Sequence, residues 1–322
     1  MPLENKPDVI STDHSDDGID RRGFLKCMAW AGTGALCVLK GGVLKSYGLS
    51  DRFNLDHAAN GELSFVQISD SHMGFNKAAN PDVVGTLKAA VDKINALPAP
   101  PEFILHTGDI SHLSKPAEFD TVDQILRSAP TKDLFFVPGE HDVLEDNGKQ
   151  YLERYGKNTK GAGWYSFDVK GAHFVGLVNV MNLKAGGMGS LGAEQLEWLE
   201  EDVKHLSKST PIVVFAHMPL WTIYEPWGWG TGDAPQLMQQ LRRFGSVTVL
   251  NGHIHQVVQK VEGNVLFHTA RSTAYPQPEA GVGAGPGPLK VPPEQLASML
   301  GVSSVTLVNH GRSLALSDAT IA

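Results

Sequence analysis

The chain has 322 residues, of which 42% are hydrophobic, so it can build a large packed core and is neither a minimal fold nor a disordered chain. Its formal net charge of −8 at pH 7 gives no support for a nucleic-acid-binding surface, because such a surface needs a basic stripe. The 2 cysteines, Cys27 and Cys37, both precede residue 60. The rest of the chain therefore offers neither a disulfide nor a thiolate ligand for a metal.

The beginning of the chain differs in character from the rest. Residues 1–20 are polar and acidic and are predicted to be disordered. The stretch Asp20-Arg21-Arg22-Gly23-Phe24-Leu25-Lys26 follows, and then a short apolar run, Met28–Leu39. An arginine pair ahead of such a run resembles a twin-arginine export signal, with Asp20 where Ser or Thr is usual. The alternative is a solvated arginine pair ahead of a buried helix.

The export resemblance implies a partner and a location. The twin-arginine export machinery would carry the folded protein out of the cytoplasm, so the expected location is the periplasm. The apolar run is too short for a stable transmembrane span. No clear Ala-x-Ala cleavage site follows, so both cleavage and retention as an N-terminal membrane anchor stay open. We divide the chain into a disordered N-terminus with signal and linker, 1–60, and one domain, 61–322.

In the body of the chain, strands first alternate with helices, and hairpins dominate later. Up to residue 160, the predicted strands are Leu63–Ser69, Glu102–His106 and Leu134–Val137, and the predicted helices start at Pro81, Pro116 and Lys149. After that come strands over Trp164–Val169, His173–Val180, Pro211–Ala216, Val247–Leu250, Val257–Val261 and Val265–Thr269, with helices over Ala193–Leu206 and Ala234–Phe244. A Pro- and Gly-rich loop, Tyr275–Pro293, is a lid or a plain connector, and a last hairpin joins Val302–Asn309 to Ser313–Ser317. This order predicts an α/β fold, a four-layer α-β-β-α sandwich of two mixed sheets flanked by helices.

Five short motifs follow apolar, β-branched runs, where a buried strand would give way to a loop. They are Asp70-Ser71-His72, Gly108-Asp109, Gly139-Glu140-His141-Asp142, His217 and Gly252-His253-Ile254-His255. Together they supply carboxylates and imidazoles for two metal ions, and such ligands without thiolates suit Mn, Fe or Zn. A metal pair can activate a water and stabilise the entering and leaving oxygens of a phosphoryl transfer. The motifs therefore predict a metal-dependent hydrolase of phosphate esters.

The ordered motifs resemble the calcineurin-like metallophosphoesterase family, from Phe65 to about Thr269. The resemblance implies two divalent or trivalent metal ions bridged by a hydroxide that attacks phosphorus in line. It assigns Asp70, His72, Asp109 and His255 to one ion, and Asp109, Glu140, His217 and His253 to the other. His141 is not a ligand in the family pattern and is expected to face the substrate, where it hydrogen-bonds a phosphate oxygen or protonates the leaving group. The alternative role for His141 is to orient the loop that carries Glu140.

Glu140 departs from the family, which usually has Asn at this position. Asn offers a neutral amide oxygen, whereas Glu is longer by one methylene and charged. An extra anion should bind cations more tightly, favour a more highly charged ion, lower Lewis acidity and repel an anionic phosphate. We expect an active site with altered metal preference. The alternative is an exported metal-binding protein with weakened or lost hydrolase activity.

The substrate is expected to be a small-molecule phosphoester, and its binding residues are sought near His217. A Gly-rich loop there carries Trp221, Trp227 and Trp229, whose rings could stack on a nucleobase, sugar or aryl group. The alternative is an apolar loop folded over the sheet. Arg271, which follows a predicted strand, is a further candidate for phosphate contact. Because the Trp loop could hold a second ester group, a phosphodiester is favoured over a phosphomonoester.

Overall fold

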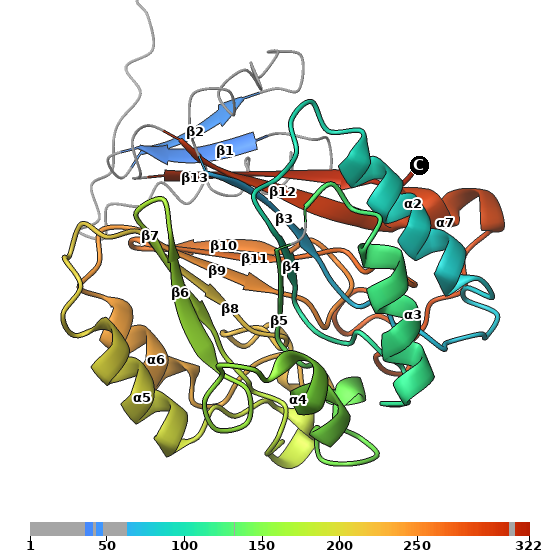
Figure 1. Cartoon of the computed structure of the whole chain (residues 1–322), viewed down its shortest axis with the longest axis horizontal. Coiled ribbons are helices and arrows are strands. Elements are labelled where there is room, and N and C mark those ends of the chain that lie inside the picture. The colour runs from blue at the N-terminus through green and yellow to red at the C-terminus, as the bar shows by residue number, and fades with distance from the viewer. Residues whose placement is uncertain (1–35, 41–42, 48–62, 132, 309–312) are drawn as a thin grey trace, which may run out of the picture.

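The structure of the chain, a computed structural model, describes residues 36–40, 43–47, 63–131, 133–308 and 313–322 (Figure 1). In this part of the chain, most strands belong to two sheets. One has the strand order β13 (Ser313–Thr320), β12 (Gly301–Val308), β3 (Ser64–Ile68), β4 (Ile104–His106) and β5 (Leu134–Phe136). The other has the order β10 (Gln259–Glu262), β11 (Val265–Thr269), β9 (Val247–Asn251), β8 (Ile212–Phe215), β7 (Ala172–Gly176) and β6 (Tyr165–Val169).

Both sheets are mixed. Strands β3, β4 and β5 pair in parallel, and β12 pairs antiparallel with both β3 and β13. In the second sheet β7, β8, β9 and β11 are parallel, and the edge strands β6 and β10 are antiparallel to their neighbours. The carboxyl ends of the parallel strands therefore collect at one edge of each sheet, which is where open α/β sheets carry their ligand sites.

Helices cover the outer face of each sheet (Figure 1). The described helices are α2 (Val83–Asn95), α3 (Pro116–Leu126), α4 (Lys149–Tyr155), α5 (Ala193–Val203), α6 (Ala234–Leu241) and α7 (Pro293–Met299), with short 3₁₀ segments η3 (Glu140–Asp142), η4 (Ala185–Gly187) and η5 (Glu225–Trp227). On the first sheet, Val66 packs in one apolar cluster with Leu87 of α2 and Phe119 of α3. On the second, Leu199 of α5 and Leu237 of α6 pack against β7, β8, β9 and β11. The predicted four-layer sandwich is confirmed.

A third apolar cluster fills the space between the two sheets. Phe65 of β3 lies edge-on to Phe174 of β7, with ring centroids 5.4 Å apart, and Phe215 of β8 belongs to the same cluster. Side chains alternate along β3, so Phe65 faces the second sheet while Val66 packs against the helices. Gln67 shares the inner face and donates from Nε2 to the carbonyl oxygen of Asn251, at 3.1 Å.

The structure adds elements that the sequence pattern does not predict. Helix α7 starts at Pro293, where the predicted Pro- and Gly-rich loop ends; its seven residues are too few to show a helical period. Strand β7 ends at Gly176, although the apolar run continues to Val180. Residues 177–180 are buried without belonging to a sheet, which is why their composition resembles a strand.

Two short strands lie inside the segment expected to form signal and linker. Strand β1 (Leu36–Lys40) pairs antiparallel with β2 (Val43–Tyr47). The arginine pair and the start of the apolar run lie outside the described residues. Among the helices that the structure describes, none is both long enough and apolar enough to cross a membrane.

Candidate metal centre

The candidate ligands meet at the edge where the parallel strands end. Asp70, Asp109 and Glu140 follow β3, β4 and β5, whereas His217 and His253 follow β8 and β9 of the other sheet. The chain turns sharply at these strand ends. Positive φ angles, which residues other than glycine rarely adopt, occur at Asp70 (54°), His72 (38°), Asp109 (51°), His253 (71°) and His255 (58°). Backbone strain of this kind persists where the surrounding structure enforces it, and it concentrates at functional sites.

One group of ligand candidates consists of Asp70, His72 and His255, whose ligand atoms lie within 4.8 Å of one another. The Nε2 atoms of His72 and His255 are 3.2 Å apart, and His255 Nε2 lies 3.3 Å from Oδ1 of Asp70. All three side chains are buried. The other ring nitrogen of His255 donates to the carbonyl oxygen of Tyr275 at 2.5 Å, which fixes the orientation of the imidazole.

A second group consists of Glu140, His217 and His253. The carboxylate of Glu140 reaches both histidines: Oε2 lies 2.9 Å from Nε2 of His217, and Oε1 lies 3.0 Å from Nδ1 of His253. His217 is oriented from behind, because its Nδ1 donates to the carbonyl oxygen of Thr107 at 2.7 Å. The longer side chain at position 140 thus contacts both histidines of its group.

Asp109 joins the two groups. Its Oδ2 lies 3.5 Å from Nε2 of His72 in the first group and 3.4 Å from Nε2 of His217 in the second. Its Oδ1 accepts the backbone N–H of His141 at 2.9 Å. Gly139 gives this carboxylate room, since a Cβ there would lie 2.0 Å from Oδ1. One oxygen is therefore held by the backbone, and the other faces ligand candidates on both sides.

The charges of the centre depend strongly on one another. Burial alone would raise the pKa of the Glu140 carboxyl, but His253 and His217 outweigh burial and hold that pKa well below its ordinary value. For His217, burial alone would lower the pKa, but the carboxylates of Asp109 and Glu140 raise it well above its ordinary value. The carboxylates thus favour a positive charge on His217, and a metal cation would supply the same compensation.

The donor set fits a metal pair. Buried atoms without a hydrogen-bond partner among the described residues gather here: Nδ1 of His72, Oε2 of Glu140, Nε2 of His217 and both ring nitrogens of His253. Buried polar atoms are usually paired, so such a cluster marks a place where a bound group completes the structure. Oxygen and nitrogen donors without sulfur suit Mn, Fe or Zn.

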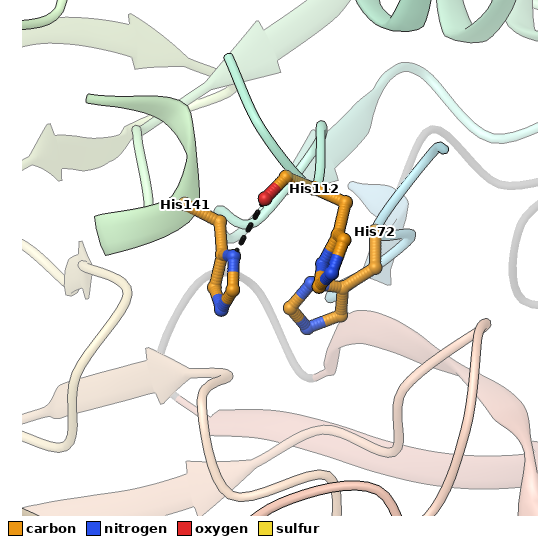
Figure 2. Close-up of side chains that lie close together, drawn as sticks. All are labelled: His72, His112 and His141. Carbon is orange, nitrogen blue, oxygen red and sulfur yellow. Dashed lines mark hydrogen bonds between the residues drawn. The ribbon is translucent and has the colours of Figure 1, made fainter. Parts of the chain in front are cut away.

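His141 lies beside the first group and not within it. Its Nδ1 donates to the backbone carbonyl of His112 at 2.8 Å, and its ring stacks on that of His112 with centroids 4.8 Å apart (Figure 2). The ring also meets His72 edge-on, at 4.7 Å. Burial lowers the pKa of His141, but the carboxylates of Asp109 and Glu140 outweigh it and raise that pKa.

Asp142, the last residue of its motif, ties two ligand loops together. Its carboxylate accepts the backbone N–H groups of Ile110, Ser111 and Gly139, at 3.1, 2.8 and 2.9 Å. The loop after β4 and the loop after β5 are thereby held in one arrangement. Asp142 belongs to the motif Gly139-Glu140-His141-Asp142, but the spacing of that motif does not indicate that Asp142 links the two loops.

Tyr275 and Gln277 are contacts of the centre that the sequence reasoning missed. Besides accepting from His255, Tyr275 stacks its ring on His72, with centroids 4.8 Å apart and an interplanar angle of 24°. Gln277 donates from Nε2 to the backbone carbonyl of His253 at 3.0 Å. Burial raises the pKa of the Tyr275 phenol, and the carboxylates of the centre raise it further. Their position at the start of a predicted connector loop gave no signal.

The predicted substrate residues make contacts with other parts of the fold. Trp229 is buried beneath Trp227, with ring centroids 5.1 Å apart, and Trp221 packs on Phe267 of β11 at 4.9 Å. Arg271 donates from Nη1 to the carbonyl oxygen of Met299 at 3.2 Å. Among the described residues, no hydrogen bond, ion pair or ring contact links the three tryptophans or Arg271 to the ligand candidates. Their contact with a substrate stays a prediction.

A two-sheet sandwich with two connected groups of carboxylates and imidazoles at the strand ends is the architecture of a metal-dependent phosphoesterase. The sequence profile of the calcineurin-like phosphoesterase family matches residues 63–257, which is more than half of the chain. The chain belongs to this family, whose members use a pair of metal ions.

Relatives named as phosphatases and phosphodiesterases support the assignment as an enzyme. The serine/threonine-protein phosphatase CPPED1 of Danio rerio is 26% identical over 226 residues, covering 61% of this chain and 71% of the relative. A 3′,5′-cyclic-nucleotide phosphodiesterase of a Nostoc species is 25% identical over 219 residues, covering 66% and 79%. A probable glycerophosphodiester phosphodiesterase of Arcobacter nitrofigilis is 24% identical over 223 residues, covering 65% and 78%.

Solved structures share the fold. A dimetal phosphatase from Danio rerio superposes with a TM-score of 0.55 at 15% identity, covering 79% of this chain and 98% of that chain. A purple acid phosphatase from yellow lupin seeds gives a TM-score of 0.60 at 15% identity, covering 81% and 52%. At this identity the likeness concerns the arrangement of sheets and helices alone.

Proposed function

We propose that the chain hydrolyses phosphodiesters with a pair of divalent or trivalent metal ions. The observation that carries the proposal is the shared carboxylate: Oδ2 of Asp109 lies within 3.5 Å of His72 Nε2 and 3.4 Å of His217 Nε2, one from each group. A single oxygen in that position suits two ions that act together on one phosphate.

The residues that would hold the ions fall into two sets that share Asp109. One set adds Asp70, His72 and His255; the other adds Glu140, His217 and His253. Metal ions bound there would supply Lewis acidity and an activated water at neutral pH. The backbone carbonyls of Thr107 and Tyr275 hold His217 and His255 in the tautomer that leaves Nε2 free to bind.

We propose that His141 protonates the leaving group. Its Nδ1–H is engaged by the carbonyl of His112, so the other ring nitrogen, Nε2, is the atom available to a substrate. The ring is half-buried and contacts His72 of the first set. A positioned imidazole can give a proton to the departing ester oxygen as the phosphorus–oxygen bond breaks.

The test is turnover of aryl and alkyl phosphodiesters by metal-reconstituted protein and by its His141→Ala variant. We expect the variant to bind the same amount of metal and to lose about 10²- to 10⁴-fold in kcat for an alkyl leaving group, since general acid catalysis contributes that much. The loss should be smaller for p-nitrophenolate, which leaves without a proton. An undiminished alkyl rate would remove His141 from the mechanism.

Two observations support a diester over a monoester. Two of the relatives described above are named as phosphodiesterases, one for cyclic nucleotides and one for glycerophosphodiesters. The loop after His217 carries Trp221 and Trp227, which are only half-buried and could hold a second ester group. A higher kcat/KM for bis(p-nitrophenyl) phosphate than for p-nitrophenyl phosphate supports this preference, and the reverse order contradicts it.

A second candidate function is an exported metal-binding protein with weakened or lost hydrolysis. The contact of the Glu140 carboxylate with both His217 and His253 favours it, because a third carboxylate places more negative charge where phosphate must bind. Full metal occupancy without turnover of any phosphoester would select this candidate.

We also propose export to the periplasm, supported by the arginine pair ahead of a short apolar run. Fractionation and immunoblotting of cells that express the full chain would test it. Replacing both Arg21 and Arg22 by Lys, which keeps the charge, should retain the protein in the cytoplasm, whereas Lys6→Gln, which removes a charge outside the pair, should be exported normally. Export of the double variant would contradict the proposal.

A further inference from the structure

Tyr275 lies against the imidazoles of the first metal set. The residue is 3% exposed. Its ring stacks on His72 and is tilted by 45° against His255, with a centroid distance of 4.7 Å to the latter. Phe75 packs against the same ring at 4.3 Å. The backbone is fixed as well, because the carbonyl of Tyr275 accepts from His255 and its N–H donates to Oγ of Ser272 at 3.2 Å.

The hydroxyl of Tyr275 differs from those of Tyr151, Tyr155 and Tyr165. Tyr151 and Tyr165 both donate to the carbonyl oxygen of Phe136, at 3.0 and 2.9 Å, and Tyr155 donates to Asp123 at 2.7 Å. The hydroxyl of Tyr275 makes no hydrogen bond with any of the residues that the structure describes. A phenol hydroxyl that the chain leaves without a partner is available to a bound group.

The surroundings of the phenol indicate what that group is. The Tyr275 ring contacts the imidazoles of both His72 and His255, so the phenol borders the metal centre. His141 contacts the same His72 ring, at 4.7 Å, so Tyr275 and His141 both border the first metal set. An O–H donor at this position meets the anionic oxygens of a phosphoryl group bound by the metals.

We propose that the hydroxyl of Tyr275 donates a hydrogen bond to a non-bridging oxygen of the substrate phosphoryl group. The inference rests on the proposed phosphoesterase function and adds a substrate-contacting residue to it. The contact strengthens as negative charge grows on that oxygen in the transition state, which is the condition for a catalytic effect. The stacked ring has a separate role, which is to hold His72 and His255 in place.

Two variants separate the hydroxyl from the ring. Tyr275→Phe keeps the stacking and removes only the donor. We expect it to retain the wild-type metal content and to lose about 10- to 100-fold in kcat/KM, the loss typical of a hydrogen bond to a charged group. Tyr275→Ala should lose metal as well. Tyr165→Phe also removes a buried hydroxyl and should leave kcat/KM unchanged.

A binding measurement makes the result independent of turnover. Inorganic phosphate is titrated into metal-loaded protein and its binding is measured by calorimetry. We expect it to bind Tyr275→Phe at least several-fold more weakly than it binds wild type or Tyr165→Phe. If the wild type hydrolyses no phosphoester but shows this difference, the proposed function fails while the contact stands. The contact would be overturned if Tyr275→Phe and wild type had equal phosphate affinity and equal kcat/KM. It would also be overturned if the metal-loaded wild type bound no phosphate.

Discussion

Glu140 is the residue at which this chain departs most clearly from its family. Because its carboxylate lies within 3.0 Å of nitrogen atoms of both His217 and His253, Glu140→Asn would remove one negative charge and one of these contacts. Metal affinity rises with the number of charged ligands, so we expect the variant, which has one fewer, to release metal at a roughly tenfold lower chelator concentration. Its turnover per bound metal pair should rise, since Lewis acidity increases and phosphate is repelled less.

Metal analysis after dialysis against graded chelator, with rates measured on the same samples, checks the Glu140 prediction. Glu145→Gln is the matched control, because it removes an exposed charge from the same loop without touching the ligand sets. Unchanged metal content together with an unchanged rate in Glu140→Asn would show that the acidic ligand has no effect on the centre.

Some residues of the site could be predicted from the sequence, and others could not. The ligand candidates sit in compact motifs directly after strands, so their residue types and spacing could be recognised in the sequence, and the structure brings them together. The contacts of Tyr275 and Gln277 arise from a loop that returns to the centre after β11. Neither residue belongs to a motif, and only the folded chain shows that this loop passes beside His253 and His255.

At the scale of elements, local pattern predicted the strands and the longer helices because burial and periodicity coincide there. Residues 65–68 of β3, for example, are all buried, with alternate side chains in different apolar clusters. The assignment of strands to sheets could not be predicted in this way. Strand β12 joins the first sheet by pairing Val305 with Phe65. The local sequence around either residue does not indicate a partner 240 positions away. Helix α7 was missed because its seven residues include no buried one.

For the whole molecule, the centre lies where loops from both sheets meet, so metal binding should stabilise the complete sandwich. Asp70 and Asp109 are 0% and 2% exposed, and among the described residues the ion-pair partners of their carboxylates are imidazoles. A ligand present at 100 times its Kd stabilises the folded state by about 2.7 kcal/mol. For a domain of this size, 1 kcal/mol corresponds to roughly 2–4 °C in Tm, so removing each ion should lower Tm by about 5–10 °C.

Thermal unfolding of the full chain with and without chelator measures this linkage. The Tm of wild type and of Glu145→Gln should fall by the full increment of about 5–10 °C per ion when metal is removed. Asp109→Asn should lose much less, because it lacks the carboxylate that lies between His72 and His217 and so binds metal poorly from the start. If wild type has the same Tm with metal and with chelator, the two ligand sets do not bind ions tightly enough to stabilise the fold. If Asp109→Asn shows the full increment, its carboxylate is not shared between two ions.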